Sequence, residues 1–371
     1  MFQFLARIKE LERRGAQIIH FEIGDPSFET PAPVIEAAQQ SLNRGETHYT
    51  DSLGLRDLRE AIVKFTAQRL GFRPALEQVL VTPANAIVDF MIRCVADPGA
   101  AVMYPDPGFP TYQAVIRYAG FRGISVPLDE TRGFHMNPQT VRERLTADTR
   151  VIIVNSPSNP TGAVMAAADA KEIYEIARAH DLYILSDEVY YALTFDKPFN
   201  SPSIYDQARE RVVVLNSFSK IYDMSGWRLG YALGPEKLIA KMGLLLQTII
   251  SCLPAFIQRG GIAALALPPE HVQAKVAELR RRRDVLINGL NSLPGVKCAL
   301  PEGSFYAFPS IKGTGLNGEE FVEQMLTKAG VAVLSGKAFG SCGDGYVRLS
   351  YGSADVPLIK KAIEKMRSAL A

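Results

Sequence analysis

A lysine, an arginine and two serines lie close together in the chain, and their types can bind a phosphate and an aldehyde. Ser217, Ser219 and Lys220 follow the apolar segment 212–215, and Arg228 comes eight residues after the lysine. Two hydroxyls and a guanidinium can hold a phosphate, and an amine can form a Schiff base with an aldehyde. A lysine that follows a strand is more often a solvated loop residue, so this motif alone does not decide between the two interpretations.

Other chemically useful residues follow the ends of predicted strands. From residue 79 onward, short apolar strands alternate with helices, which is typical of a largely parallel sheet covered on both faces. Ligands of such sheets bind beyond the carboxyl ends of the strands. The residues at these ends are Ala84 and Asn85 after strand 79–82, Phe109 after 101–104, Asn159 after 151–154, Asp187 and Tyr190 after 182–186, and Lys220 after 211–215.

Each of these residues also has an ordinary structural explanation. Asp187 could cap a helix, Asn159 with the following proline could form a turn, and Phe109 could belong to the core. Their gathering at one sheet edge is harder to explain without a ligand. Pyridoxal phosphate carries both an aldehyde and a phosphate and would suit this set of groups. The set consists of an amine, a carboxylate, a phenol, an amide, an aromatic ring and a helix N-terminus that could bind the phosphate.

The motifs around these residues resemble those of the class I and II pyridoxal-phosphate-dependent aminotransferases of fold type I. The similarity extends from Gly24 to the last helix. The matching motifs are Gly24-Asp25-Pro26, Thr47-His48-Tyr49-Thr50, Asn159-Pro160-Thr161-Gly162, Ser186-Asp187-Glu188-Val189-Tyr190, Ser217-Phe218-Ser219-Lys220, Gly226-Trp227-Arg228-Leu229-Gly230 and Val347-Arg348-Leu349-Ser350-Tyr351.

This resemblance implies an α/β fold with two domains. The large domain, residues 41–272, would contain a mostly parallel seven-stranded sheet flanked by helices. The smaller α+β domain would combine residues 1–40 with residues 273–371. We expect the N-terminal helix, residues 4–14, to pack on this smaller domain.

The resemblance also implies roles around the ring of pyridoxal 5'-phosphate. Lys220 would hold the cofactor as an aldimine and would later move the proton of the substrate α-carbon. Asp187 would pair with the pyridine nitrogen, and Phe109 would stack on the ring. Asn159 and Tyr190 would hydrogen-bond the phenolic oxygen of the ring.

The remaining roles concern the phosphate and the substrate. Ser217, Ser219, Arg228 and the backbone amides of Ala84 and Asn85 would bind the phosphate.

Tyr49 would reach that phosphate from a neighbouring subunit, so the resemblance implies a homodimer. Arg348 would bind the substrate α-carboxylate through two parallel hydrogen bonds, a geometry that suits arginine better than lysine. Gly24 and Asn159 would also lie at the substrate.

The predicted activity is therefore transamination. An amino acid would give its amino group to the cofactor and leave as a 2-oxo acid, and a second 2-oxo acid would take the amino group in a ping-pong mechanism. The alternative is a carbon–sulfur β-lyase that acts on cysteine conjugates. A more remote alternative is a non-catalytic pyridoxal-phosphate-binding regulatory module, which would need an attached DNA-binding domain that we do not expect.

The composition of the 371 residues limits the other classes of function. Hydrophobic residues make up 47% and charged residues 22%, with a net charge of +2 and no basic block, so neither nucleic acid nor a membrane surface is an expected partner. The four cysteines and five histidines are scattered, which argues against a metal centre and favours a cytoplasmic protein. The segment 242–257 is too polar for a membrane span.

Two further segments need an interpretation. The segment 313–318 fits the pattern GxGxxG of dinucleotide-binding loops, but no acidic residue follows the next predicted strand, so we interpret it as a glycine-rich surface loop. Arg259 could hold a side-chain carboxylate of a substrate, and a role on a helix surface is the favoured interpretation. The family's usual glycine pair before the phosphate-binding helix is replaced here by Pro83, Ala84 and Asn85.

Overall fold

A seven-stranded sheet with the order β2-β8-β7-β6-β5-β3-β4 forms the centre of the larger part of the protein. The computed structural model describes residues 2–371. The strands are β2 (Val79–Thr82), β3 (Ala101–Asp106), β4 (Arg122–Pro127), β5 (Thr149–Asn155), β6 (Tyr183–Asp187), β7 (Val212–Ser217) and β8 (Gly230–Leu233). β8 is antiparallel to β2 and β7, and the other neighbours pair in parallel. The predicted mostly parallel sheet is confirmed, and β8 is a strand that the sequence patterns missed.

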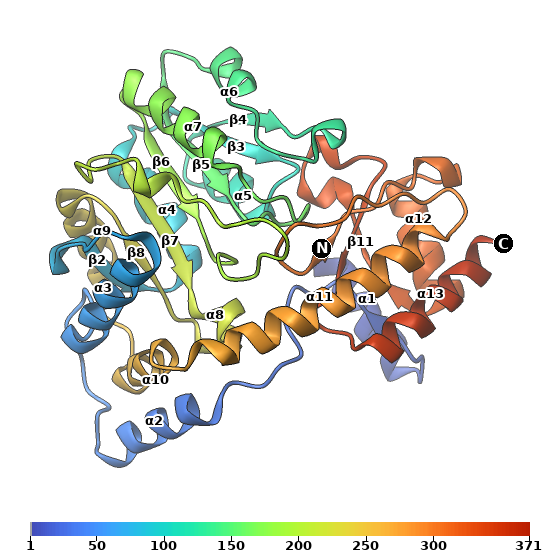
Figure 1. Ribbon diagram of the computed structural model, residues 1–371, viewed down its shortest axis with the longest axis horizontal. Helices are drawn as coiled ribbons and strands as arrows, with labels where there is room; N and C mark the ends of the chain where they lie inside the picture. The colour runs from blue at the N-terminus through green and yellow to red at the C-terminus, as the bar shows by residue number, and fades with distance from the viewer. Residues whose placement is uncertain (1) are drawn as a thin grey trace.

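Successive residues of the central strands face opposite sides of the sheet. Val151 and Ile153 of β5 belong to one buried hydrophobic cluster, whereas Ile152 and Val154 belong to another. The period of two along a strand explains this division. Helices cover both clusters, as is usual for a mostly parallel sheet. One face is covered by α4 (Ala84–Val95), α5 (Pro110–Tyr118) and α9 (Glu236–Ile249), and the other by α6 (Pro138–Arg144) and α7 (Ala167–Ala179) (Figure 1).

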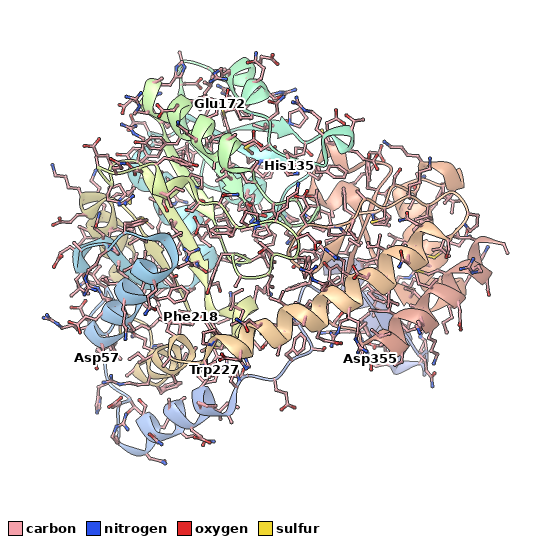
Figure 2. All side chains as sticks on the ribbon, viewed as in Figure 1. Asp57, His135, Glu172, Phe218, Trp227 and Asp355 are labelled. Atoms are coloured by element: carbon pink, nitrogen blue, oxygen red, sulfur yellow. The ribbon has the colours of Figure 1, made fainter. Side chains whose placement is uncertain are left out.

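A group of helices extends the large part beyond β2. These are α2 (Ala32–Asn43), α3 (Arg56–Leu70) and α10 (Ala255–Leu265), and α10 packs against both of the others. Gly260 allows a close approach here, because a Cβ atom at this position would lie 2.7 Å from the Trp227 ring. Phe218, the residue at which the short helix with Lys220 begins, is also close, since a Cβ atom at Gly261 would lie 3.5 Å from its ring; Figure 2 labels both Trp227 and Phe218. The predicted division of the chain at residues 40 and 272 stays a prediction.

The C-terminal part has small sheets and its own helices. The long helix α11 (Pro269–Asn291) leads to it from α10 (Figure 1). Its elements are β9 (Tyr306–Ala307), α12 (Gly318–Gln324), which continues as a π-helical segment (Met325–Ala329), β10 (Val331–Ala332), β11 (Leu334–Ser335), β12 (Val347–Ser350) and α13 (Val356–Leu370). The sheet order is β11-β12-β9, and β10 pairs with β1 (Ile19–His20).

The N-terminal helix α1 (Phe2–Arg13) packs on this C-terminal part, as predicted. Arg7 forms an ion pair with Glu323 at 2.6 Å, and Ile8 lies in a buried cluster with Leu326 and Ala332. The fold therefore joins the two ends of the chain in one unit.

The apolar residues of the sequence predict one strand over residues 17–23 and another over residues 331–334, and both predictions were wrong in their extent. The predicted strand 17–23 pairs only at Ile19–His20, because its later residues turn toward the cavity described below. The predicted strand 331–334 divides into β10 and β11, which pair with β1 and β12 in different sheets. The segment 313–318 contains the end of a short 3-10 helix (Lys312–Thr314), a turn and the first residue of α12, and most of it is exposed or half-buried, in agreement with its interpretation as a surface loop.

Among residues 2–371, no helix combines the length and the apolar character that crossing a membrane requires. The same residues contain no cluster of three or more histidine, cysteine, aspartate or glutamate side chains that could hold a metal ion.

Candidate active site

A cavity of about 320 Å³ opens at the carboxyl edge of the seven-stranded sheet. It is lined by every predicted site residue except Tyr49: Gly24, Ala84, Asn85, Phe109, Asn159, Asp187, Tyr190, Ser217, Ser219, Lys220, Arg228 and Arg348. Tyr49 lies between α2 and α3 and is 90% exposed. One chain thus brings together all predicted groups other than the one expected to act on a neighbouring subunit.

Lys220 lies in the short helix α8 (Phe218–Ile221), directly after β7. Its Nζ atom donates a hydrogen bond of 2.6 Å to the carbonyl oxygen of Gly24. Burial lowers the pKa of the Lys220 amine, and the charges of Arg228 and Arg348 lower this pKa further. The amine is therefore easier to deprotonate than a solvated lysine, which suits a nucleophile or a base.

Asp187 is the last residue of β6 and is buried. Its Oδ2 atom accepts a hydrogen bond of 2.5 Å from the hydroxyl of Tyr112, and its Oδ1 atom accepts one of 3.3 Å from the amide of Val189. Burial raises the pKa of the Asp187 carboxyl to about 6. A cationic nitrogen of a ligand is the kind of partner that would favour the ionised carboxylate here.

Two asparagines connect the ends of β5 and β6 with the C-terminal part. Asn155 donates a hydrogen bond to the carbonyl oxygen of Asp187 and accepts one of 2.8 Å from the amide of Asn159. The side-chain oxygen of Asn159 accepts a hydrogen bond of 3.2 Å from Arg348. Asn159 is thereby held at the cavity wall through its backbone amide by Asn155 of β5 and through its side chain by Arg348.

Arg348 comes from the middle of β12 and is only 5% exposed. It donates a hydrogen bond of 2.6 Å to the carbonyl oxygen of Glu22, and its guanidinium carbon lies 4.6 Å and 4.8 Å from the ring centres of Tyr306 and Phe339. Within residues 2–371 no carboxylate forms an ion pair with it, and its Nε atom has no hydrogen-bond partner. A buried guanidinium stays charged, so this geometry fits an anionic ligand group.

Another group of lining residues provides donors for a phosphate. Helix α4 begins at Ala84 after Pro83, and no side chain caps its first amides. A Cβ atom at Gly230 would lie 3.0 Å from the amide nitrogen of Ala84, so glycine keeps the space beside this helix end open. Free amides at a helix N-terminus bind anions. Ser217 and Ser219, whose hydroxyl oxygens lie 2.9 Å apart, and Arg228 line the same cavity.

Sequence reasoning missed two tyrosines of this cavity. Tyr112 lies in the first turn of α5, three residues after Phe109, and Tyr306 lies in β9. The strand-end rule would have found Tyr112 if it had included the first turn of the following helix. No sequence signal pointed to Tyr306, because β9 belongs to a different sheet. Leu5 of α1 and Ile23 add apolar side chains to the lining.

These groups fit pyridoxal phosphate. The uncapped helix end and the two serines match a phosphate, the buried Asp187 carboxylate matches a ring nitrogen that carries a proton, and Lys220 matches an aldehyde. Arg348 belongs to a different sheet from the strand that ends at Ser217, and it has no carboxylate partner among the described residues, so it suits an anionic group of a second molecule.

Comparisons with known proteins agree with this geometry. The family model described as "Aminotransferase class I and II" matches residues 16–366. The aspartate aminotransferase of Pyrococcus horikoshii is 36% identical over 98% of this chain and 94% of its own length, and the arginine–pyruvate transaminase of Pseudomonas aeruginosa is 36% identical over 96% and 90%. The crystal structure of an aromatic aminotransferase from Pyrococcus horikoshii OT3 superposes with a TM-score of 0.92, at 35% identity over 98% of both chains.

These names give no support to the carbon–sulfur β-lyase that the sequence left open as an alternative. The matches extend over nearly the whole chain, from the first strand to the last helix. The protein therefore belongs to the class I and II aminotransferases and is a transaminase that depends on pyridoxal phosphate.

Proposed function

We propose that this transaminase divides its cavity into a cofactor end and a substrate end, with Lys220 between them. The observation that carries the proposal is the buried Arg348, which has no carboxylate partner among the described residues and lies in the same cavity as Lys220 and Asp187. Pyridoxal phosphate, when bound, supplies an aldehyde for the amino group and a ring that accepts electrons from the substrate α-carbon.

The cofactor end consists of residues that bind pyridoxal phosphate and orient its ring. Ser217, Ser219, Arg228 and the first amides of α4, at Ala84 and Asn85, bind the phosphate.

Asp187 keeps a proton on the ring nitrogen, and the hydrogen bond from Tyr112 fixes the direction of its carboxylate. Asn159 and Tyr190 donate hydrogen bonds to the ring oxygen, and Phe109 stacks on the ring. Phe109 is itself held by an edge-to-face contact with Tyr112, with ring centres 5.6 Å apart.

The substrate end holds the amino acid by its α-carboxylate. Arg348 binds this group with two parallel hydrogen bonds, supported by Asn159 and by the backbone at Gly24. Lys220 would take the proton from the substrate α-carbon at its Nζ atom and would later release it, while the cofactor would supply the ring that accepts the electrons of the broken bond. Burial lowers the pKa of this amine, which favours the neutral form that can take up a proton. The ping-pong sequence follows because both the amino acid and the 2-oxo acid use the same Arg348.

We also propose that the active unit is a homodimer in which Tyr49 reaches the phosphate of the neighbouring subunit. Tyr49 is 90% exposed, and the adjacent Thr50 is hydrogen-bonded to Leu253, in the loop that follows the exposed apolar Ile249 and Ile250. Exposed apolar side chains that lie together often mark an interface. We further propose a cytoplasmic location, which agrees with the four free cysteines.

A single-turnover experiment tests the proposed division of the cavity. Holoenzyme is mixed with single amino acids, including aspartate, arginine and an aromatic amino acid, and the visible absorption band of the cofactor is followed together with the 2-oxo acid formed. We expect one 2-oxo acid per site and loss of the band. Lys220→Ala should form no such band, and Arg348→Met should retain the band but react only at roughly 100-fold higher concentrations of the amino acid. A Lys220→Ala protein that still transaminates would overturn the proposal.

A further inference from the structure

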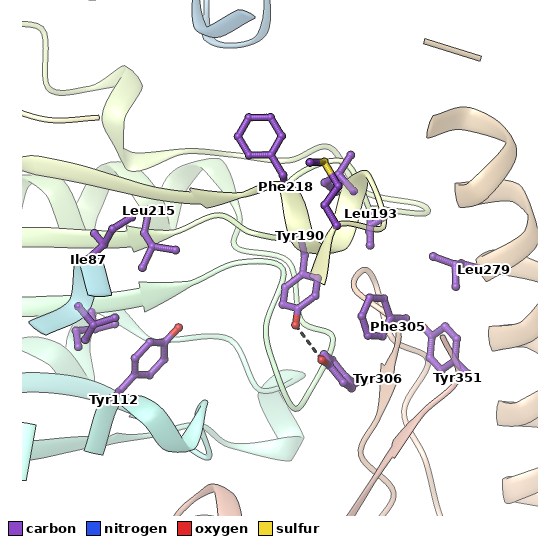
Figure 3. Close-up of a cluster of buried hydrophobic side chains, with 14 of the residues drawn as sticks. Ile87, Tyr112, Tyr190, Leu193, Leu215, Phe218, Leu279, Phe305, Tyr306 and Tyr351 are labelled. Carbon is purple, nitrogen blue, oxygen red and sulfur yellow. Dashed lines mark hydrogen bonds between the residues drawn. The ribbon is translucent and has the colours of Figure 1, made fainter. Parts of the chain in front are cut away.

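Tyr306 connects three groups of the cavity and has no role in the account above. Its hydroxyl oxygen lies 2.9 Å from that of Tyr190 (Figure 3). Its ring lies under the guanidinium of Arg348, at 4.6 Å from the ring centre. A Cβ atom at Gly24 would lie 2.2 Å from its hydroxyl oxygen, so the backbone that accepts the hydrogen bond of Lys220 packs directly on it.

The ring positions leave little freedom for either tyrosine. Tyr190 is held edge-to-face by Phe305 and Tyr306, with ring centres 5.5 Å and 5.7 Å away. Tyr306 is 1% exposed and Tyr190 is 4% exposed. Figure 3 shows the two hydroxyls pointing toward one another from β9 and from the segment after β6. Their hydrogen bond is therefore a fixed part of the cavity wall.

The direction of this hydrogen bond follows from the partners of each hydroxyl. Among the described residues, Tyr190 is the hydrogen-bond partner of the Tyr306 hydroxyl. If Tyr190 donated to Tyr306, the buried proton of Tyr306 would lack an acceptor, which is unfavourable. If Tyr306 donates instead, the proton of Tyr190 is left for the ring oxygen of the bound cofactor, and both hydroxyl protons have an acceptor in the holoenzyme. The positive charge of Arg348 over the Tyr306 ring also makes this hydroxyl the better donor.

We infer that Tyr306 is a positioning residue: it donates a hydrogen bond to Tyr190 and so directs the hydroxyl proton of Tyr190 into the cavity, toward the ring oxygen of the cofactor. This inference rests on the proposed role of Tyr190. Hydrogen bonds in a chain polarise one another, so the donated bond makes Tyr190 a stronger donor to the ring oxygen. Tyr306 thereby links the group that holds the ring oxygen with Arg348, which holds the substrate.

The consequence concerns the proton that the bound cofactor shares with Lys220. A strong donor at the ring oxygen withdraws electrons that would otherwise hold this proton, and the proton then leaves at a lower pH. Weakening the donor should raise the pH midpoint at which the visible band of the cofactor changes. This midpoint is measured by absorbance without turnover.

The test is a spectrophotometric pH titration of holoenzyme carrying Tyr306→Phe. The substitution keeps the ring under Arg348 and removes only the hydroxyl. We expect the midpoint to rise by about half a pH unit, because the hydrogen bond from Tyr190 to the ring oxygen loses the part of its strength that donation from Tyr306 adds. We expect kcat to fall about 3- to 10-fold while KM for the amino acid changes less than about twofold.

Tyr351→Phe is the matched control. Tyr351 is also fully buried, donates one hydrogen bond of 3.4 Å to the carbonyl oxygen of Ser304, and does not line the cavity. Both variants should lower the melting temperature by a similar small amount, and only Tyr306→Phe should move the midpoint.

A double-mutant cycle shows whether Tyr306 acts through Tyr190. In a Tyr190→Phe background, Tyr306→Phe should no longer move the midpoint. An unchanged or lower midpoint in the single variant, or a shift that persists in the Tyr190→Phe background, would overturn the inference while leaving the role of Lys220 intact. A wild-type enzyme without any titrating band would overturn both.

Discussion

The two arginines of the cavity occupy opposite environments. Arg228 is exposed, follows a short 3-10 helix and donates a hydrogen bond of 2.7 Å to the carbonyl oxygen of Ser225. Arg348 is 5% exposed, lies in the middle of a strand and is covered by two aromatic rings. Water solvates the first charge without a ligand, whereas the second is buried without a counter-ion. The comparison teaches that Arg228 needs no ligand to be solvated, whereas Arg348 is a buried charge whose desolvation we expect an anionic ligand to offset.

The largest expected effect follows from Arg348→Met. KM for the amino acid should rise roughly 100-fold or more, because truncating one partner of a buried charged pair costs about 2–5 kcal/mol. The unliganded protein should be as stable as the wild type or more stable, since an uncompensated buried charge is removed. Steady-state kinetics and urea unfolding check the two parts. Weakened binding of the cofactor in this variant would contradict the separation of the two ends.

Asp187 extends the comparison to a buried anion. Burial raises its pKa to about 6, above the ordinary value near 4. At a pH between about 4 and 6 the carboxyl is protonated in the folded protein and ionised in the unfolded chain. The free energy of unfolding therefore falls as the pH rises through this range, and above pH 6 the ionised carboxylate destabilises the unliganded protein. Asp187→Asn should therefore raise the free energy of unfolding of the apoprotein by about 2 kcal/mol at pH 8 and by little at pH 4.5.

The measurement for Asp187→Asn is urea unfolding of the apoprotein at both pH values. A variant that is less stable than the wild type at pH 8 would show that the carboxylate is compensated within the protein. The same variant should bind the cofactor more weakly at pH 8, because the ring nitrogen loses its charged partner.

Arg228→Met gives the opposite pattern to Arg348→Met. The dissociation constant of the cofactor should rise about 10-fold, because a hydrogen bond to a charged group contributes about 1.5–3 kcal/mol. KM for the amino acid at saturating cofactor and the stability of the apoprotein should stay near the wild-type values. Fluorescence titration with the cofactor measures the first quantity, and the comparison fails if KM rises as strongly as in Arg348→Met.

The smallest effect concerns His20 of β1, two residues before Glu22, whose carbonyl oxygen accepts the hydrogen bond of Arg348. His20 is hydrogen-bonded to Glu22 at 2.8 Å and to Glu12 of α1 at 2.9 Å, and these bonds raise its pKa to about 9. A histidine whose pKa is raised in the folded protein stabilises the fold at pH values below its ordinary pKa near 6.5. This stabilisation is lost as the pH rises through 9. His20→Gln should lower the melting temperature slightly at pH 6 and not at pH 10. An equal loss at both pH values would contradict the charged pairing.

Much of the site could be predicted because parallel strands end at the same edge of a sheet. Phe109, Asn159, Asp187 and Lys220 follow four such strands, and all of them line the cavity. Local patterns alone were sufficient for this part. The residue roles stay a prediction, because they depend on ligand positions.

The parts that local patterns missed depend on contacts distant in the sequence. Tyr306 reaches Tyr190 from a position 116 residues later in the chain, and no periodicity encodes this approach. Tyr112 contacts Asp187 across 75 residues. Strand β8 was missed because it follows Arg228 almost directly and so departs from the alternation of strands and helices on which the prediction relied.

The central claim, that Lys220 holds the cofactor, has a direct chemical test. Holoenzyme is treated with sodium borohydride, which reduces the bond between the cofactor and a lysine, and the digested protein is mapped by mass spectrometry. The account predicts the phosphopyridoxyl group on the peptide that contains Lys220 and on no other lysine. A label on a different lysine, or an unlabelled protein that still transaminates, would contradict it.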